Sequence, residues 1–178
     1  MMIIKILLLT LLVIISPSPI WAENDLMTDE CHNAQAPTTC MQCLESDPTS
    51  VHADPIGIAG VVIHCLDSRL NIIINNLTDV SSKEEKAEVK KVLEACKHDL
   101  SMEVPKKLSE AKTDLRSGDY DKAARSIMLA LGYPWSCRSN LESVKFDESL
   151  FEEALELFSQ INIYAQLSDA AMRIIDRF

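Results

Sequence analysis

Residues 87–118, AEVKKVLEACKHDLSMEVPKKLSEAKTDLRSG, carry the pattern that decides the fold. Apolar side chains recur there at steps of three or four residues, at Val89, Leu93, Cys96, Leu100, Val104, Leu108, Ala111 and Leu115. That spacing places them along one side of a helix. Pro105 should kink this helix, because proline lacks the amide hydrogen that a helix interior uses. Gly118 should end it, because glycine readily adopts the left-handed C-cap conformation.

A helix is also expected on the N-terminal side of this stretch. Asp54-Pro55 predicts its start, since aspartate is a favoured N-cap and proline suits the first helical position. Its apolar pattern runs to about Leu77. Ser81/Ser82 followed by Glu84/Glu85 resembles a capping box, which would open the next helix.

Two more helices are expected on the C-terminal side. The third should be capped by Asp119 and closed by Gly132-Tyr133-Pro134, and the fourth should run from near Phe146-Asp147 to about Ile175. Four long helices with short loops predict an all-α, antiparallel four-helix bundle over about residues 54–178. Residues 28–52 hold short helical turns that cannot bury a core of their own.

The composition excludes some functions. The chain has 178 residues, with 17 Lys and Arg against 27 Asp and Glu, a formal net charge of −10. Nucleic-acid binding relies on a basic face, so the acidic excess argues against a nucleic-acid partner. Only 4 glycines are present, which argues against a glycine-rich nucleotide-binding fold.

Residues 1–22, MMIIKILLLTLLVIISPSPIWA, have the order of features of a secretory signal peptide. Lys5 precedes an apolar run over residues 6–15, and Ala22 offers a small residue at the cleavage point. The apolar run falls short of the roughly 20 residues that span a bilayer. We therefore expect a secreted, extracellular domain over residues 23–178. No later segment is expected to be long and apolar enough to span a membrane.

Secretion changes the interpretation of the six cysteines, which lie at positions 31, 40, 43, 65, 96 and 137. An even number in an oxidising compartment favours disulfides. Cys40-Met-Gln-Cys43 has the spacing of a thioredoxin-type redox motif, but it lacks the strand and helix that this chemistry needs. Zinc binding by Cys31, His32, Cys40 and Cys43 lacks a second ligand pair at finger spacing. No metal or cofactor is expected.

No catalytic residues emerge from the sequence. The four histidines show no ligand spacing, and there is no G-x-S-x-G motif around a nucleophilic serine. Asn76-Leu77-Thr78 is a sequon for N-glycosylation, which applies to a secreted chain.

Several motifs together resemble the plant invertase/pectin methylesterase inhibitor family. They are the Cys31-x8-Cys40 spacing, the stretch LESDPTS at 44–50, Ala53-Asp54, the cysteines at 96 and 137, and Ser117-Gly118-Asp119-Tyr120 before the third helix. The resemblance covers essentially the whole mature chain. It implies a secreted four-helix bundle with an N-terminal helical hairpin, at about residues 28–52, that is not an enzyme. Such a protein would cap an enzyme's active-site cleft, and we expect it to do so as a monomer in a 1:1 complex.

The resemblance also implies particular disulfide pairs and a partner-binding surface. It implies the disulfides Cys31–Cys40 and Cys96–Cys137. It assigns partner binding to the later helices of the bundle, where carboxylates gather at Glu103, Glu110, Asp114, Asp119 and Asp121.

Two target enzymes stay open. Esterase inhibitors of the family carry acidic residues shortly after the mid-helix cysteine and the last cysteine, whereas this chain has His98, Met102 and Ser139 there. Invertase inhibitors often show Pro-Lys-Phe after the Gly-Asp pair, whereas this chain has Tyr120-Asp121-Lys122. The balance favours pectin methylesterase, with acid invertase as the alternative. A further alternative is a non-inhibitory structural or ligand-binding bundle, although bulky side chains on every helix argue against an unfilled core.

Cys43 and Cys65 lie outside the family's two pairs, and we expect them to form a third disulfide. Cys43 should face another side of the hairpin than Cys40, and Cys65 lies about three turns into the first bundle helix. The bond would fold the hairpin back along the bundle. The alternative is two buried free thiols that serve as small apolar side chains.

Overall fold

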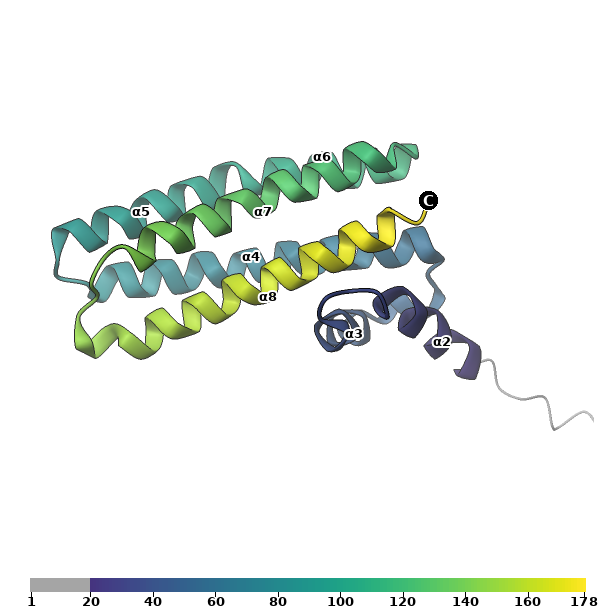
Figure 1. The fold of residues 1–178 in the computed structure, drawn as a ribbon, viewed down its shortest axis with the longest axis horizontal. Helices are drawn as coiled ribbons and strands as arrows, with labels where there is room; N and C mark the ends of the chain where they lie inside the picture. The colour runs from purple at the N-terminus through teal and green to yellow at the C-terminus, as the bar shows by residue number, and fades with distance from the viewer. Residues whose placement is uncertain (1–19) are drawn as a thin grey trace, which may run out of the picture.

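Four long helical segments lie side by side in two layers, with α5, α6 and α7 in one layer and α4 and α8 in the other (Figure 1). This computed structural model describes residues 20–178, with side chains from Leu26 onward. The elements are α2 (Ile20–Cys31), α3 (Pro37–Ser46), η1 (Pro48–His52), α4 (Pro55–Lys83), α5 (Ala87–Met102), α6 (Val104–Ser117), α7 (Tyr120–Glu142), η2 (Glu148–Leu150) and α8 (Phe151–Ile175). The expected all-α bundle with a preceding hairpin is confirmed. The signal-peptide expectation rests mainly on residues 1–19, which lie outside the described residues.

Two of the expected helix ends are confirmed in atomic detail. The Asp54 carboxylate accepts a hydrogen bond from the amide of Gly57 at 2.7 Å, which caps the start of α4. Gly118 ends α6 with a φ of 77°, the left-handed conformation that favours glycine. The tight turn that follows sends the chain directly into α7.

The expected capping box at Ser81/Ser82 is wrong, because α4 continues through both serines to Lys83. Their side chains serve other partners: the Ser81 hydroxyl donates to a carboxylate oxygen of Glu94 at 2.6 Å. Glu84 is buried at the turn, where its carboxylate accepts a hydrogen bond from the amide of Lys86 at 2.9 Å. Val80 extends the buried stripe of α4 past Leu77, which explains why the helix does not stop earlier.

The two prolines act differently from one another. At Pro105 the expected single helix is interrupted: α5 ends at Met102, and Pro105 lies in the first turn of α6, where no helical amide bond is lost. Pro134 does not close α7, contrary to expectation, and the helix runs on to Glu142. Pro134 is buried, and the Cys96–Cys137 disulfide fixes the next turn of α7 to α5. These contacts offset the proline's lost hydrogen bond.

The last helix also begins later than expected. A 3-10 turn, η2, precedes α8, and Asp147 lies at the N-cap of this turn. Phe146 stays outside the helix and packs partly on the core. Two large apolar residues of α4 and α8, Ile72 and Leu155, lie outside the core and are 39% and 46% exposed.

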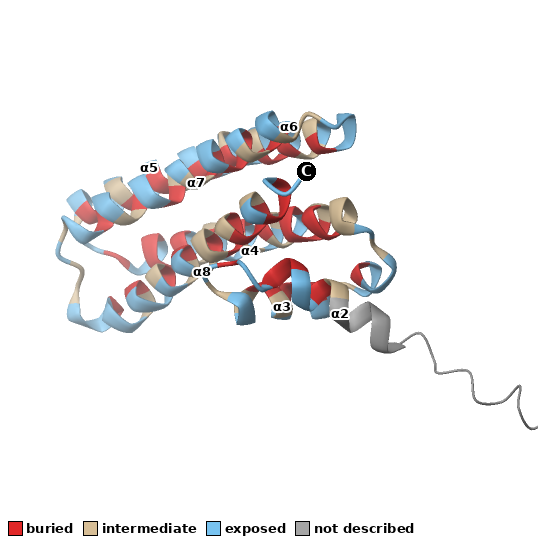
Figure 2. Ribbon diagram, turned by 45° about the vertical axis from the view of Figure 1, so that its right-hand side comes forward, coloured by how far each residue is buried: buried red, intermediate tan, exposed pale blue. Residues whose placement is uncertain are grey.

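Buried side chains line the inward sides of all four helical segments (Figure 2). The expectation that no later segment is long and apolar enough to span a membrane is wrong, because α4 meets both criteria among the described residues. It packs along its length against α8 and contributes a row of fully buried residues to the core. Its apolar composition therefore matches that of a central core helix in a bundle.

Candidate functional site

The six cysteines form three disulfides, in the pairings that the sequence analysis expected: Cys31–Cys40, Cys43–Cys65 and Cys96–Cys137. Their Cα atoms are 5.6, 6.1 and 5.2 Å apart, respectively. The first closes the hairpin, the second joins α3 to α4, and the third joins α5 to α7. Together they close the hairpin, fix it to α4 and tie α5 to α7 within one layer of the bundle.

The hairpin also docks on α8 through polar contacts. Thr39 donates to Gln166 at 2.7 Å, and the amide of Gln35 donates to the Asp169 carboxylate at 2.7 Å. The hairpin therefore lies on the opposite layer from α5, α6 and α7. It leaves the outer side of that layer uncovered.

The carboxylates proposed for partner binding separate into groups. Asp114, Asp119 and Asp121 gather at the α6–α7 turn, where the amide of Asp119 donates to the carbonyl of Asp114 at 2.9 Å. The Asp119 carboxylate forms an ion pair with Lys122. This contact raises the pKa of Lys122 above its usual value. Asp119 is the N-cap residue of α7, but its side chain forms no capping hydrogen bond, contrary to expectation.

The other two carboxylates lie further back along the layer. Glu110 pairs with Lys107 at 2.7 Å and raises the pKa of that lysine. Glu103 lies at the opposite end of α6 and pairs with Lys106 at 2.9 Å. The 14 residues of α6 correspond to about 20 Å, so the structure does not bring Glu103 to the α6–α7 turn.

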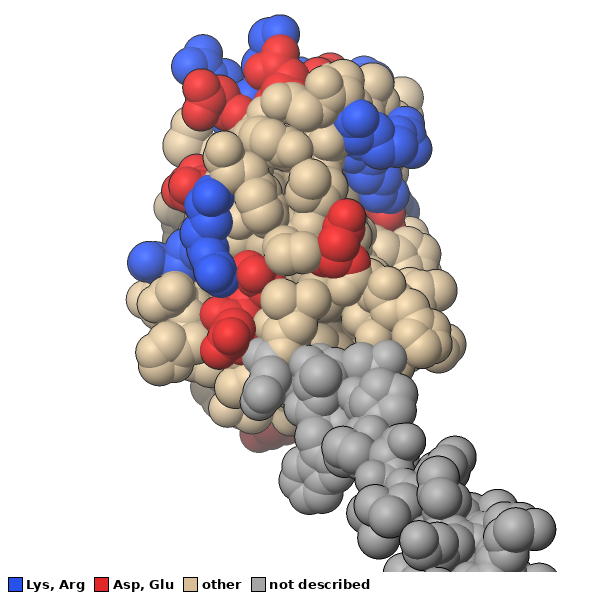
Figure 3. Space-filling view, turned by 90° about the vertical axis from the view of Figure 1, so that its right-hand side faces the viewer, with Lys and Arg blue, Asp and Glu red and all other residues tan. Residues whose placement is uncertain are grey.

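Figure 3 looks onto the end of the bundle that contains this turn, and acidic and basic side chains there surround uncharged surface. Three of the five predicted carboxylates, Glu103, Glu110 and Asp119, have a lysine partner on the same helix. The region is therefore a set of paired charges with a few unbalanced carboxylates rather than one acidic field.

The outer side of α7 carries large apolar side chains that are exposed. Met128, Leu129 and Trp135 are 56%, 47% and 44% exposed. Asp121, Met128 and Trp135 are spaced by seven residues, so they lie nearly in line along α7, about 10 Å apart. We call Asp121, Met128, Leu129 and Trp135 the α7 surface. The seven-residue spacing is visible in the sequence, but it does not tell which side of the helix faces solvent.

A hollow of about 350 Å³ adjoins the α7 surface, between α7 and the α5–α6 segment. Leu129 and Tyr133 line it from α7, and Asp99 and Lys107 line it from α5 and α6. The hollow supplies an apolar wall next to charged groups of both signs. Such a surface can receive a side chain from a protein partner.

A second hollow, of about 570 Å³, lies where α7 leads into α8. Phe146, Phe151, Leu155 and Phe158 line it, and the guanidinium of Arg138 stacks 5.5 Å from the ring centre of Phe158. The hollow lies beside the buried apolar cluster, against which Phe146 and Phe158 pack.

Asn76 lies within α4, half-exposed, seven residues before the helix ends at Lys83. The side chain of Thr78, the third residue of the sequon, donates to the carbonyl of Ile74 at 2.8 Å.

Among the described residues no cluster of His, Cys, Asp and Glu is arranged to hold a metal ion.

A model of the plant invertase/pectin methylesterase inhibitor family matches residues 25–174. The chain belongs to this family. It is thus an enzyme-inhibitor protein of the plant invertase/pectin methylesterase inhibitor type, and not itself an enzyme. The pectinesterase inhibitor of Actinidia deliciosa is 27% identical over 138 residues, which cover 74% of each chain.

Two further comparisons extend this result for the invertase/pectin methylesterase inhibitor family. The cell wall / vacuolar inhibitor of fructosidase 2 of Arabidopsis thaliana is 31% identical over 110 residues, or 60% of this chain and 59% of that protein. The crystal structure of a mutant form of a pectin methylesterase inhibitor from Arabidopsis superposes with a TM-score of 0.63 at 17% identity. It covers 84% of this chain and 95% of that one, which shows a shared fold.

Proposed function

We propose that this chain is a secreted inhibitor of pectin methylesterase that caps the enzyme's active-site cleft in a 1:1 complex. The observation that carries the proposal is the α7 surface. Its apolar centre at Met128, Leu129 and Trp135 is exposed although the adjacent helices are closely packed. Protein interfaces combine an apolar centre, often with Met or Trp, and a polar rim.

The carboxylates provide that rim. Asp114, Asp119 and Asp121 flank one end of the α7 surface, and Glu103 and Glu110 lie along α6 beside it. Their excess negative charge would attract a basic face on the enzyme and steer its approach. The disulfide Cys96–Cys137 holds α5 and α7 in a fixed relation, so little ordering is needed on binding.

Two observations favour pectin methylesterase over acid invertase as the target. The Actinidia relative that bears the pectinesterase inhibitor name is matched over more of the chain than the fructosidase inhibitor. The residues after Gly118-Asp119 also differ from the Pro-Lys-Phe pattern of invertase inhibitors. Acid invertase is the second candidate, because the fructosidase inhibitor has the higher identity over its matched region.

Secretion and glycosylation belong to the same proposal. The signal-like residues 1–22 and the three disulfides suit an oxidising, extracellular compartment such as the cell wall. Asn76 is the proposed glycan site, and the mature domain is proposed to start at residue 23 and to act as a monomer.

The test uses the secreted, mature protein with both enzymes. Residual activity of a plant pectin methylesterase and of an acid invertase is measured at several pH values between about pH 4.5 and about pH 7.5. Loss of esterase activity alone supports the proposal. Loss of invertase activity alone would show that acid invertase, and not pectin methylesterase, is the target. Full activity of both enzymes would overturn the inhibitory function.

A further inference from the structure

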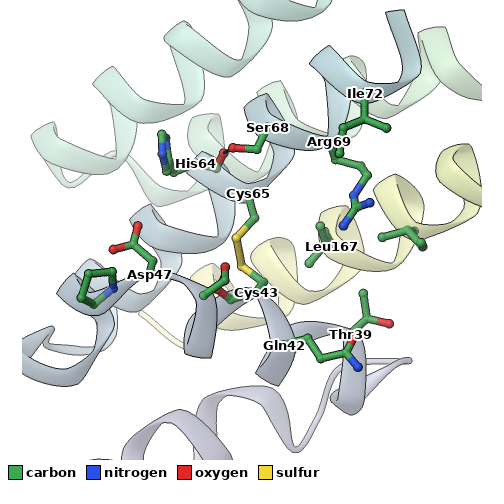
Figure 4. A pocket seen from close by; sticks show the side chains of 13 residues that line it. Thr39, Gln42, Cys43, Asp47, His64, Cys65, Ser68, Arg69, Ile72 and Leu167 are labelled. Carbon is green, nitrogen blue, oxygen red and sulfur yellow. Dashed lines mark hydrogen bonds between the residues drawn. A yellow bond between two sulfur atoms is a disulfide. The ribbon is translucent and has the colours of Figure 1, made fainter. Parts of the chain in front are cut away.

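The Cys43–Cys65 disulfide lies in the wall of a cleft between the hairpin and the bundle (Figure 4). The cleft has a volume of about 490 Å³ and opens to solvent. Gln42 lines it from α3, and His64, Ser68 and Arg69 line it from α4. In the close-up, the two sulfur atoms bridge α3 and α4.

This bridge differs from the other two in accessibility. Cys65 is partly exposed, whereas Cys31 and Cys40 are 1% and 0% exposed. Cys96 and Cys137 are each 4% exposed, although they adjoin the smaller hollow beside α7. An external thiol can therefore approach the sulfur of Cys65 more readily than any other sulfur of the described disulfides.

The charges of the cleft suit an approaching thiolate. The guanidinium of Arg69 carries a permanent positive charge and is held by a 2.6 Å hydrogen bond to Gln160. Among the described residues, Asp47 is the only one that contributes a carboxylate to the cleft, and one oxygen of this carboxylate already accepts two hydrogen bonds from Thr49. A neighbouring cation lowers the energy of a thiolate and promotes exchange.

We propose that Cys43–Cys65 is a thiol–disulfide exchange site, whose reduction by a dithiol loosens the hairpin while the bundle stays folded. A thiolate of the dithiol attacks the sulfur of Cys65, forms a mixed disulfide and displaces the thiolate of Cys43, which takes a proton from water. The second thiolate of the dithiol then attacks the dithiol's other sulfur in the mixed disulfide and displaces the thiolate of Cys65, which also takes a proton from water. The dithiol ends as a disulfide. The two electrons that it gives up reduce Cys43–Cys65 to two thiols.

The contacts that remain after reduction of Cys43–Cys65 determine which part of the protein loosens. Cys43–Cys65 is the only disulfide that links the described hairpin to the bundle. After its reduction, the hairpin keeps its own bridge and contacts α8 through polar groups such as Thr39 and Gln35 and through apolar packing. The bundle keeps Cys96–Cys137. The hairpin should then open locally at a lower free energy than the bundle.

Limited reduction of the mature protein tests the site. The folded protein is treated with dithiothreitol at neutral pH, the free thiols are alkylated at intervals, and peptides are mapped by mass spectrometry. Cys43 and Cys65 should be alkylated at least about tenfold faster than the other four cysteines. Equal or faster reduction of either other bridge, or no reduction without denaturant, would overturn the proposal.

A pair of variants distinguishes access through the cleft from general instability. Ser68 lines the cleft, and Ser82 lies further along α4 and is exposed; the hydroxyl of each donates to a backbone carbonyl of its own helix. Ser68→Phe should slow reduction of Cys43–Cys65 roughly threefold or more, because the larger side chain partly shields the disulfide from the thiol. Ser82→Phe should leave the rate unchanged. Equal rates in both variants would contradict the assigned route.

Hydrogen exchange tests the consequence. In the double variant Cys43→Ser/Cys65→Ser, amides of residues 26–52 should exchange at least about tenfold faster than in the parent protein, and amides of residues 87–142 should keep their rates. Unchanged exchange in the hairpin, or faster exchange throughout the bundle, would show that the bridge does not control the hairpin alone.

Discussion

The hydroxyl of Thr39 in α3 donates a 2.7 Å hydrogen bond to the side-chain oxygen of Gln166 in α8, 127 residues further along the chain. This contact joins the hairpin to the layer of α4 and α8. It places the hairpin away from α7, so the hairpin and the proposed enzyme-binding surface are separate parts of the molecule.

Replacing Thr39 with valine should therefore weaken hairpin docking. Valine keeps the shape of threonine but cannot donate to Gln166, so the free energy of unfolding should fall by about 1 kcal/mol. Thr38→Val is the matched control, because Thr38 is exposed in the same helical turn. Chemical unfolding followed by circular dichroism measures both; an equal loss in the two variants would rule out the docking bond as the cause.

Met128→Ser tests the apolar centre of the α7 surface. Met128 is 56% exposed, so the substitution should barely change stability, but it removes apolar contact with the enzyme. Inhibition of pectin methylesterase should weaken about tenfold, which corresponds to about 1.4 kcal/mol of binding free energy. Ile72→Ser removes a comparably exposed apolar side chain from α4 and should leave inhibition unchanged. Equal inhibition by both variants would exclude the α7 surface.

Asp119→Ala with Asp121→Ala tests the carboxylates at the α6–α7 turn. Removing two negative charges should slow association with a basic enzyme face at low salt, and the difference should shrink as salt screens the charges. Glu85→Ala with Glu88→Ala is the control, since it removes the same charge from the exposed start of α5. Inhibition that stays the same in the aspartate variant at every salt concentration would show that this end of the bundle does not face the enzyme.

Glu30 should make stability depend on pH. Its carboxyl group is 3% exposed, and burial raises its pKa, although Arg177 at 2.8 Å opposes the shift. A raised folded-state pKa means that the folded protein binds the proton more tightly than the unfolded chain does. The contribution of Glu30 is therefore most favourable below the unfolded-state pKa of about 4.3 and is lost as pH rises through the folded-state value.

Glu30→Gln removes this titration. The unfolding free energy of the wild type, relative to that of the variant, should fall as pH rises from about 4 to about 7. Urea unfolding of both proteins at several pH values measures the difference. A difference that rises with pH would mean that the pairing with Arg177 outweighs burial.

The sequence predicts helices well where local pattern and capping agree. The stripe from Val89 to Leu115, the cap at Asp54 and the left-handed Gly118 all appear in the structure as expected. Pro134 shows the limit of such reasoning. A local rule ends the helix there, but burial and the neighbouring disulfide, which come from tertiary structure, let α7 continue.

The candidate surface was harder to predict than the fold. The carboxylates can be chosen from the sequence, but their lysine partners and the separation of Glu103 from the α6–α7 turn depend on helix length and rotation. The exposure of Met128 and Trp135 could not be predicted, because hydrophobicity does not reveal whether another helix covers a given side. Only the positions of α5, α6 and α8 around α7 decide which residues of α7 stay exposed.

Hydrogen exchange of the mature protein, with and without an equimolar amount of pectin methylesterase, tests the central claim most directly. Amides near the α6–α7 turn and along α7, over residues 114–136, should exchange more slowly in the mixture, because the enzyme covers them. Amides of the hairpin, over residues 37–52, should keep their rates. Unchanged exchange everywhere, or protection confined to the hairpin, would contradict the proposed complex.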